Sequence, residues 1–241
     1  MQIIGVDHVQ FAVRDVAAGA RCLAQYGYEP SFHESRFNAE PRSFFRGIEK
    51  SMAYLTRGIS RIEVITGAEH RGGVHYVPVF AWHDSTRACD PTELSTVWHD
   101  ELSSICARGA GEHPVLDAVI VRTSELERSS AFWQSLGFQE VAVDDRCHAR
   151  AFPRNMVSMP LALFLTRAGD DALHEAKADD LGCSSIALIT RDLSADRAAL
   201  AEERYSVSEA TRFFINRRPV TVCFASGPSG ELVELVEFER A

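Results

Sequence analysis

The N-terminal part of the chain follows a pattern that predicts a strand, a helix and a second strand. Residues 5–13 alternate apolar and polar side chains in the manner of a half-buried strand. Asp15 follows where a helix N-cap is expected, and the helix is predicted over 16–25. Gly27 provides the stop, so Tyr28 opens the next extended segment.

The same order returns twice along the chain, at 116–121 and at 184–189. In each copy a position on the first strand is followed seven residues later by the predicted helix cap. These pairs are His8 and Asp15, Ala118 and Glu125, and Ser185 and Asp192. The equal spacing indicates an internal repeat.

A second spacing supports the repeat. Nineteen residues after the same strand position stand Gly27 and Gly137 in the first two copies, and Arg204 in the third. Each copy closes on a further apolar strand, at 61–65, 161–165 and 231–236. Each unit is therefore interpreted as a βαβββ module of about 50–60 residues.

A degenerate copy is predicted between the first two. Residues 74–82 have the pattern of a first strand, and the apolar stripe over 92–108 predicts a helix that ends at Gly109. We therefore expect an N-terminal domain at 1–113, with an intact module at 1–70 and a degenerate one at 71–113. The C-terminal domain, 114–241, is expected to hold the other two modules.

Composition and net charge restrict the classes of partner that the protein can bind. The 241 residues carry a net charge of −9, which argues against nucleic acid and anionic membrane as partners. The 46% hydrophobic content is that of a globular protein, and no apolar run approaches the roughly 20 residues of a membrane span. No basic leader precedes residue 5, and none of the six cysteines forms a CxxC pair. These features predict a soluble, reduced, cytoplasmic protein.

Three segments, 6–15, 132–138 and 227–235, resemble the vicinal oxygen chelate superfamily, which includes glyoxalase I, extradiol dioxygenases and bleomycin-binding proteins. The resemblance covers most of the chain except 84–114. It implies an α+β fold in which tandem βαβββ modules pair, and their curved mixed sheets form cups. One fold hosts many chemistries, so the resemblance does not fix the reaction.

The resemblance also implies a divalent metal held by a His or Gln on a module's first strand and a Glu on its last strand. His8 and Glu63 match these positions in the first module. Strands offer every second side chain to one face, so His8, Gln10 and Glu63 are all expected to face the cup. A buried carboxylate needs a partner. That partner is a metal in the first interpretation and an arginine in the second.

The other copies depart from the pattern. The second has Ala118 and Leu163 at these places, and the third has Ser185, with only Glu234 left. The C-terminal pair of modules is therefore expected to lack such a metal site. Glu234 is interpreted either as a relic of a lost site or as a buried acid tied to an arginine.

The third ligand is left open by the sequence. His75, near the start of the degenerate module's first strand, is the first candidate, and His83, on the same face by alternation, is the second. His8, Glu63 and His75 together make the facial triad of non-haem Fe(II) oxygenases. In the alternative, a homodimer supplies His8 and Glu63 twice, which resembles the site of glyoxalase-type lyases.

The leading hypothesis is a metal-dependent enzyme that binds two adjacent oxygens of a small substrate. The triad favours an Fe(II) dioxygenase of the extradiol type. The dimeric site favours a lyase or isomerase that uses Zn, Ni, Co or Mn. A third hypothesis is a non-catalytic, drug-sequestering protein with an aromatic-lined cup, formed by Phe32, Phe37, Phe44, Phe45 and Tyr54.

Overall fold

The structure is a computed structural model. It describes residues 1–38, 42–47, 49–68, 75–80, 95–102, 104–108, 115–143, 145–153, 155–168, 173, 175–215 and 218–239. His83, the second candidate for the third ligand, lies outside these described residues. Among the described residues no helix is long and apolar enough to cross a membrane.

The first module has the predicted βαβββ order. Its elements are β1 (Ile3–Val13), α1 (Val16–Ala24), β2 (Glu29–Asn38), the short 3-10 helix η1 (Arg42–Phe44), β3 (Glu49–Arg57) and β4 (Ser60–Thr66). The predicted cap of α1 is confirmed, because the Asp15 carboxylate accepts hydrogen bonds from the backbone N–H groups of Ala17 and Ala18.

Two further modules follow this order, the last with one additional strand. One comprises β8 (Leu116–Thr123), α2 (Leu126–Ser135), β9 (Gln139–Val143), β10 (Cys147–Ala151) and β11 (Ala162–Arg167). The last comprises β12 (Gly182–Thr190), α3 (Leu193–Glu202), β13 (Ser206–Val207), β14 (Thr211–Ile215), β15 (Arg218–Ser226) and β16 (Leu232–Phe238).

The nineteen-residue spacing has a structural cause. Gly27, Gly137 and Arg204 all have left-handed backbone conformations, with φ of 79°, 96° and 67°. Each follows the end of a helix, where this conformation turns the chain toward the next strand. Arg204 adopts it without being glycine, so the third copy keeps this backbone conformation although its residue type differs.

The degenerate module differs from the prediction. It contains β5 (Tyr76–Phe80), β6 (Ser95–His99) and β7 (Ser104–Arg108), so the helix predicted over 92–108 is wrong. β6 and β7 pair as antiparallel strands. The residues Thr96, Val97 and Trp98 have strong strand propensity, and this outweighs the helical spacing of the apolar positions.

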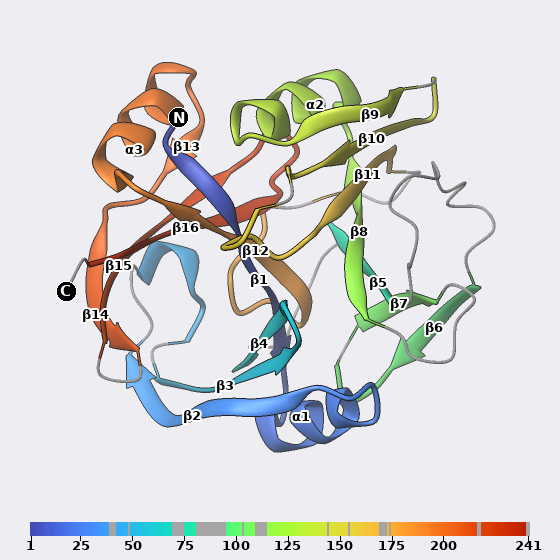
Figure 1. Ribbon diagram of the computed structural model, residues 1–241, viewed down its shortest axis with the longest axis vertical. Helices are drawn as coiled ribbons and strands as arrows, with labels where there is room; N and C mark the ends of the chain where they lie inside the picture. Colours follow the sequence, from blue (N-terminus) through green and yellow to red (C-terminus); the bar gives the residue numbers. More distant parts are fainter. Residues whose placement is uncertain are drawn as a thin grey trace.

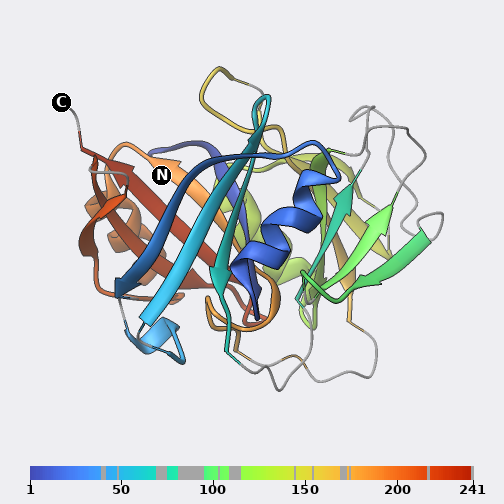
Figure 2. The ribbon, with the colours of Figure 1, turned by 90° about the horizontal axis from the view of Figure 1, so that it is seen from below.

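The strands of the described residues form two mixed sheets (Figures 1 and 2). The nine-stranded sheet has the order β13-β15-β16-β12-β1-β4-β3-β2, with β14 paired to β15. The seven-stranded sheet has the order β6-β7-β5-β8-β11-β10-β9. The α+β fold of tandem modules with curved mixed sheets is therefore confirmed.

The modules do not pair in chain order. β1 runs antiparallel to β12, so the first module shares its sheet with the last, and the two middle modules share the other. The expected division at 113 and 114 had placed neighbouring modules together. A repeat in sequence identifies equivalent strands but does not determine which copies meet, and this is why the pairing was not predicted.

The strand alternation separates two faces. Val9, Phe11 and Val13 of β1 belong to the main hydrophobic core, on the side covered by helices. The opposite, concave face of the nine-stranded sheet carries His8 and Gln10, both nearly buried. The fold thus places polar side chains inside a cup, as the alternation predicted.

Candidate metal centre

A β-bulge in β1 brings two neighbouring polar side chains to the same place. Val6 pairs with Leu188 and His8 with Ala187, so Asp7 is an extra residue in the ladder. Such bulges re-aim side chains that would otherwise point to opposite faces. Here the Asp7 carboxylate turns back to the His8 ring, and its Oδ2 lies 2.9 Å from His8 Nδ1.

Two glutamates from different modules approach the other ring nitrogen. Glu63 on β4 pairs in register with Gln10, and Glu234 on β16 pairs with Ala187. Both carboxylates face the cup, and one Oε2 of each lies 3.7 Å from His8 Nε2. The structure therefore brings together His8 and Glu63, as expected, and adds Glu234.

The atoms at the centre are withdrawn from water. His8 is 4% exposed and each glutamate 7% exposed. Within the part of the chain that the structure describes, His8 Nε2 is buried and has no hydrogen-bond partner, because the 3.7 Å to each glutamate oxygen is too long for a hydrogen bond. An unpartnered buried nitrogen between two carboxylates is costly unless it carries a proton or meets a cation.

The ionisable groups perturb one another. Burial acts to lower the pKa of His8, but the Glu63, Asp7 and Glu234 carboxylates outweigh burial and raise the pKa to about 9. Burial raises the pKa of Glu234 to about 8, against the opposing charge of His8. Burial also raises the pKa of Glu63. A proton on His8 Nε2 therefore occupies the position that a metal ion would take.

Asp7 is held from three sides. Besides His8, it accepts a hydrogen bond from the Tyr54 hydroxyl at 3.0 Å, and Arg61 Nη1 lies 3.2 Å from its Oδ1. Burial acts to raise the pKa of Asp7, yet His8, Arg61 and Tyr54 together hold the pKa below its usual range. Asp7 is therefore a buried carboxylate with a fixed orientation.

Ser185 lies on the same face, on the strand beside β1. It pairs with Gln10, two residues from the Ala187 that pairs with His8, and it is fully buried. Its hydroxyl has no hydrogen-bond partner among the described residues. Ser185 stands where a symmetrical module would repeat His8, and it leaves a small polar atom near the centre instead of an imidazole.

The third expected ligand lies elsewhere. His75 directly precedes β5, and its backbone oxygen accepts a hydrogen bond from Arg122 N on β8, in the seven-stranded sheet. It is buried there. The triad of His8, Glu63 and His75 is thus split between the two sheets, and Glu234 accompanies His8 and Glu63 instead. The sequence signal for Glu234 was its match to the last-strand position.

The equivalent positions of the other sheet are apolar. Ala118 corresponds to His8, as expected. However, Ile120 pairs with Phe164 as Gln10 pairs with Glu63, so the counterpart of Glu63 is Phe164 and not Leu163. Leu163 lies one residue away and belongs to the helix-side core. The conclusion that this module has no ligands holds with the corrected residue.

The aromatic residues expected in the cup divide into two groups. Phe32 stacks on Tyr54 at a ring-centroid distance of 5.1 Å, and Tyr54 meets the His8 ring edge-on at 5.5 Å. Phe37 is partly buried against the same region, and Phe45 contacts both this region and the Phe224 ring. Phe44, in contrast, is buried on Phe224 and fills the cup of the last module.

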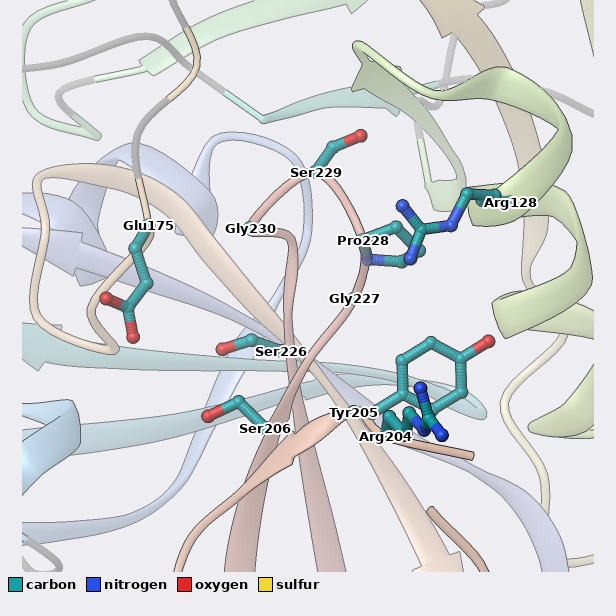
Figure 3. Close-up of a pocket in the computed structure, with 10 residues that line it drawn as sticks. All are labelled: Arg128, Glu175, Arg204, Tyr205, Ser206, Ser226, Gly227, Pro228, Ser229 and Gly230. Atoms are coloured by element: carbon teal, nitrogen blue, oxygen red, sulfur yellow. The ribbon is translucent and has the colours of Figure 1, made fainter. Parts of the chain in front are cut away.

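A separate hollow of about 430 Å³ lies at the β15–β16 turn (Figure 3). Arg128 and Arg204 line one part, but the hydroxyls of Ser206 and Ser226 point away from them. Ser229, in the same turn, is engaged by the start of α2, where its Oγ lies 2.5 Å from Thr123 Oγ1. The polar groups of this hollow do not converge, unlike those around His8.

The side chains around His8 are of the types that bind metal ions. They are not arranged in the closed geometry of a metal-bound site. Within the described ranges, no group of three or more His, Cys, Asp or Glu side chains is already arranged to hold a metal ion. Two ligands that each lie about 2.1 Å from a cation are at most about 4.2 Å apart. The two 3.7 Å separations from His8 Nε2 fall within that limit.

Comparisons with known proteins agree with this architecture. Glyoxalase I from Zea mays superposes with a TM-score of 0.62 at 15% identity, over 97% of this chain and 92% of that one. The antibiotic binding protein TnmS3 from Streptomyces sp. CB03234 gives a TM-score of 0.36 at 19% identity, over 51% of this chain and 94% of that one. No family model and no curated protein sequence matches the chain. The superposition on glyoxalase I therefore shows that the chain shares the fold of that protein, as the sequence motifs indicated.

Proposed function

We propose that this protein is a divalent-metal-dependent enzyme acting on a small substrate with two adjacent oxygens, with His8, Glu63 and Glu234 as the metal ligands. One observation carries the proposal. His8 Nε2 is buried and without a hydrogen bond, and it lies 3.7 Å from a carboxylate oxygen of both glutamates. A bound divalent ion supplies Lewis acidity toward the substrate oxygens.

The donor set favours proton transfer over oxygen chemistry. One imidazole and two carboxylates suit Mn²⁺, Zn²⁺, Co²⁺ or Ni²⁺, whereas the Fe(II) oxygenase triad needs two imidazoles and one carboxylate. The second imidazole of that triad was to be His75, which belongs to the other sheet. We therefore favour a lyase or isomerase over the extradiol-type dioxygenase. The glutamates come from one chain, so this proposal needs no dimer.

The residues of the chain have separable roles in this proposal. Glu63 and Glu234 hold the cation, and either carboxylate can also take a proton from a substrate carbon next to a carbonyl. Ser185 Oγ is free to donate a hydrogen bond to a substrate oxygen, since it is buried without a partner. The low exposure of the site excludes bulk water from the reacting atoms. We also propose that the protein is located in the cytoplasm.

Metal content tests the proposal directly. The full chain is purified, stripped with chelator and titrated with Zn²⁺, Mn²⁺, Co²⁺ and Ni²⁺, and with Fe²⁺ under anaerobic conditions. We expect one ion per chain and a loss of affinity of at least about 100-fold in His8→Ala, because a direct ligand contributes more than an outer-shell partner. His148→Ala, on β10 of the other sheet, is the matched control. Stoichiometric binding that survives His8→Ala contradicts the assignment.

A second readout separates the reaction classes. Deuterium incorporation from solvent into α-hydroxy ketones or α-keto acids, followed by NMR, detects proton transfer without knowledge of the natural substrate. Oxygen uptake with catechols and Fe²⁺ detects the dioxygenase alternative. We expect deuterium exchange that depends on the metal and on Glu234. Oxygen uptake without exchange would overturn the choice of class.

Non-catalytic binding is the second candidate, favoured by the aromatic rings beside His8. Phe32 and Tyr54 are only partly buried and stack on each other. Stacked rings of this kind can hold a flat apolar ligand. A ligand that binds equally well to the metal-free protein and to His8→Ala, but not to Phe32→Ala, favours sequestration.

A further inference from the structure

The strongest unassigned feature of the site is the carboxylate next to His8 in the sequence. On an ordinary strand, residues 7 and 8 point to opposite faces. The bulge at Asp7 removes this constraint, and Asp7 Oδ2 lies 2.9 Å from His8 Nδ1. We propose that Asp7 is a positioning residue, which fixes the His8 ring through Nδ1 so that Nε2 is directed between Glu63 and Glu234. This inference rests on the proposed function, with His8 as a metal ligand.

The contacts of Asp7 support this role. A carboxylate that only packed beside His8 would be free to rotate, but Tyr54 donates to Oδ2 and Arg61 approaches Oδ1. Arg61 is itself anchored, since its Nη2 donates to the backbone oxygen of Val157 at 2.8 Å. The carboxylate plane is therefore fixed before any ligand arrives.

The orientation has a chemical consequence for His8. An imidazole that donates its Nδ1–H to a carboxylate keeps its Nε2 lone pair for a cation once Nε2 has lost its proton. The negative charge of Asp7 also makes Nε2 a stronger donor. The Tyr54 ring, edge-on to His8 at 5.5 Å, limits the rotation of the imidazole on one side. Asp7 thus acts through His8 and is not itself placed among the ligands.

The chain contains its own control for this arrangement. Asp117 precedes Ala118 in β8 as Asp7 precedes His8 in β1, and β8 has the same register shift against β5 at this point. The aspartate and the bulge are therefore present in both sheets, but an imidazole follows only in the nine-stranded one. A loss of metal affinity specific to Asp7 would separate the positioning role from a general role in the strand.

The test compares Asp7→Asn with Asp117→Asn in the full-length protein. We expect Zn²⁺ affinity measured by calorimetry to fall by about 10- to 100-fold in Asp7→Asn, and to stay unchanged in Asp117→Asn. Tyr54→Phe removes one holder of Asp7 and should lower affinity less, by a few-fold. Zn²⁺ affinity of folded Asp7→Asn within twofold of the wild type would overturn the proposal.

A spectroscopic readout makes the test independent of metal binding. In ¹⁵N-labelled, metal-free protein, the His8 Nδ1–H proton should resonate at low field and exchange slowly with water, because it is held by a buried carboxylate. We expect this signal to move upfield and broaden in Asp7→Asn, with the His148 signals unchanged. A His8 signal that does not move overturns the positioning role.

The two proposals fail in different ways. If the wild type binds none of the metal ions, the proposed function fails, and the NMR measurement on Asp7→Asn still decides whether Asp7 orients His8. If Asp7→Asn does not fold, Tyr54→Phe carries both measurements. Unchanged Zn²⁺ affinity and an unchanged His8 signal in Tyr54→Phe would then count against the proposal.

Discussion

The two sheets are built from the same kind of module but differ in what they hold in their cups. In the nine-stranded sheet the concave face carries His8, Glu63 and Glu234. In the seven-stranded sheet the corresponding face is a small apolar cluster of Val77, Val79, Ala118, Ala149 and Phe164. A few inward-facing positions therefore decide whether a cup is lined by ionisable side chains or by apolar ones.

A second contrast lies within the nine-stranded sheet. The Asp179 carboxylate is fully buried, and it accepts hydrogen bonds from Lys50 Nζ at 2.6 Å and from the backbone N–H groups of Arg46 and Gly47. The buried Asp179 carboxylate therefore has hydrogen-bond partners, and these bonds connect two loops. Among the described residues, the printed contacts of the Glu63 and Glu234 carboxylates are the longer ones with His8 at 3.7 Å, so their arrangement is one that a bound ion would improve.

Replacement of one glutamate should have the largest effect on metal affinity, the property expected to distinguish the two sheets. We expect Glu63→Gln and Glu234→Gln each to weaken Zn²⁺ binding by about 100-fold, since the two occupy equivalent positions around His8 Nε2. Calorimetric titration measures the affinity. Phe164→Leu, at the counterpart position, is the control and should leave it unchanged. A loss confined to Glu63→Gln would show that Glu234 is only a neighbour.

The metal affinity should depend on pH, and this dependence should arise from groups of the nine-stranded sheet. The pKa values of His8, about 9, and Glu234, about 8, are raised, so both groups carry protons at neutral pH. A metal ion must displace these protons, and its affinity should therefore rise with pH. We expect up to about a tenfold increase per pH unit for each displaced proton between pH 6 and 8.

Proton release can be counted separately. Titrations in two buffers with different ionisation enthalpies give the number of protons displaced per metal ion. We expect more than one proton below pH 8 and fewer above pH 9. Metal affinity that does not change with pH would contradict the arrangement of charges around His8.

Replacement of His75, the other histidine that the sequence suggested as a ligand, should have the smallest effect on metal affinity. His75 lies at the start of β5 in the seven-stranded sheet, so His75→Ala is expected to change metal affinity by less than about threefold. Circular dichroism checks that the buried substitution leaves the fold intact. A loss comparable with that of His8→Ala would restore the triad that the sequence suggested.

Sequence reasoning located individual side chains of the candidate site better than it predicted how the modules assemble. The family resemblance selected His8 and Glu63, strand alternation placed both on the cup face, and the structure brings these two side chains together. Glu234 matched the same last-strand position, but its module has Ser185 in place of the imidazole and was therefore set aside. Only the pairing of β1 with β12 makes the two incomplete modules complementary. No local pattern encodes that pairing.

Other errors came from competition between local signals. Residues 92–108 combine helical spacing of apolar positions with strand-forming residues such as Val97 and Trp98, and the strand preference prevailed. Asp7 was missed because strict alternation places it on the helix side. The recurrence of aspartate at 7 and 117, each directly before the equivalent strand position, was a usable signal for the bulge.

The antiparallel pairing of β1 with β12 also dictates when the site can exist. His8 and Glu234 are 226 positions apart in the sequence, so β16 must be translated before the three side chains can meet. Contacts this distant in sequence form slowly, because the intervening chain must be ordered first. Until β12 arrives, the nascent first module presents an open edge along β1, and early release of the polypeptide would leave that edge available to unwanted partners.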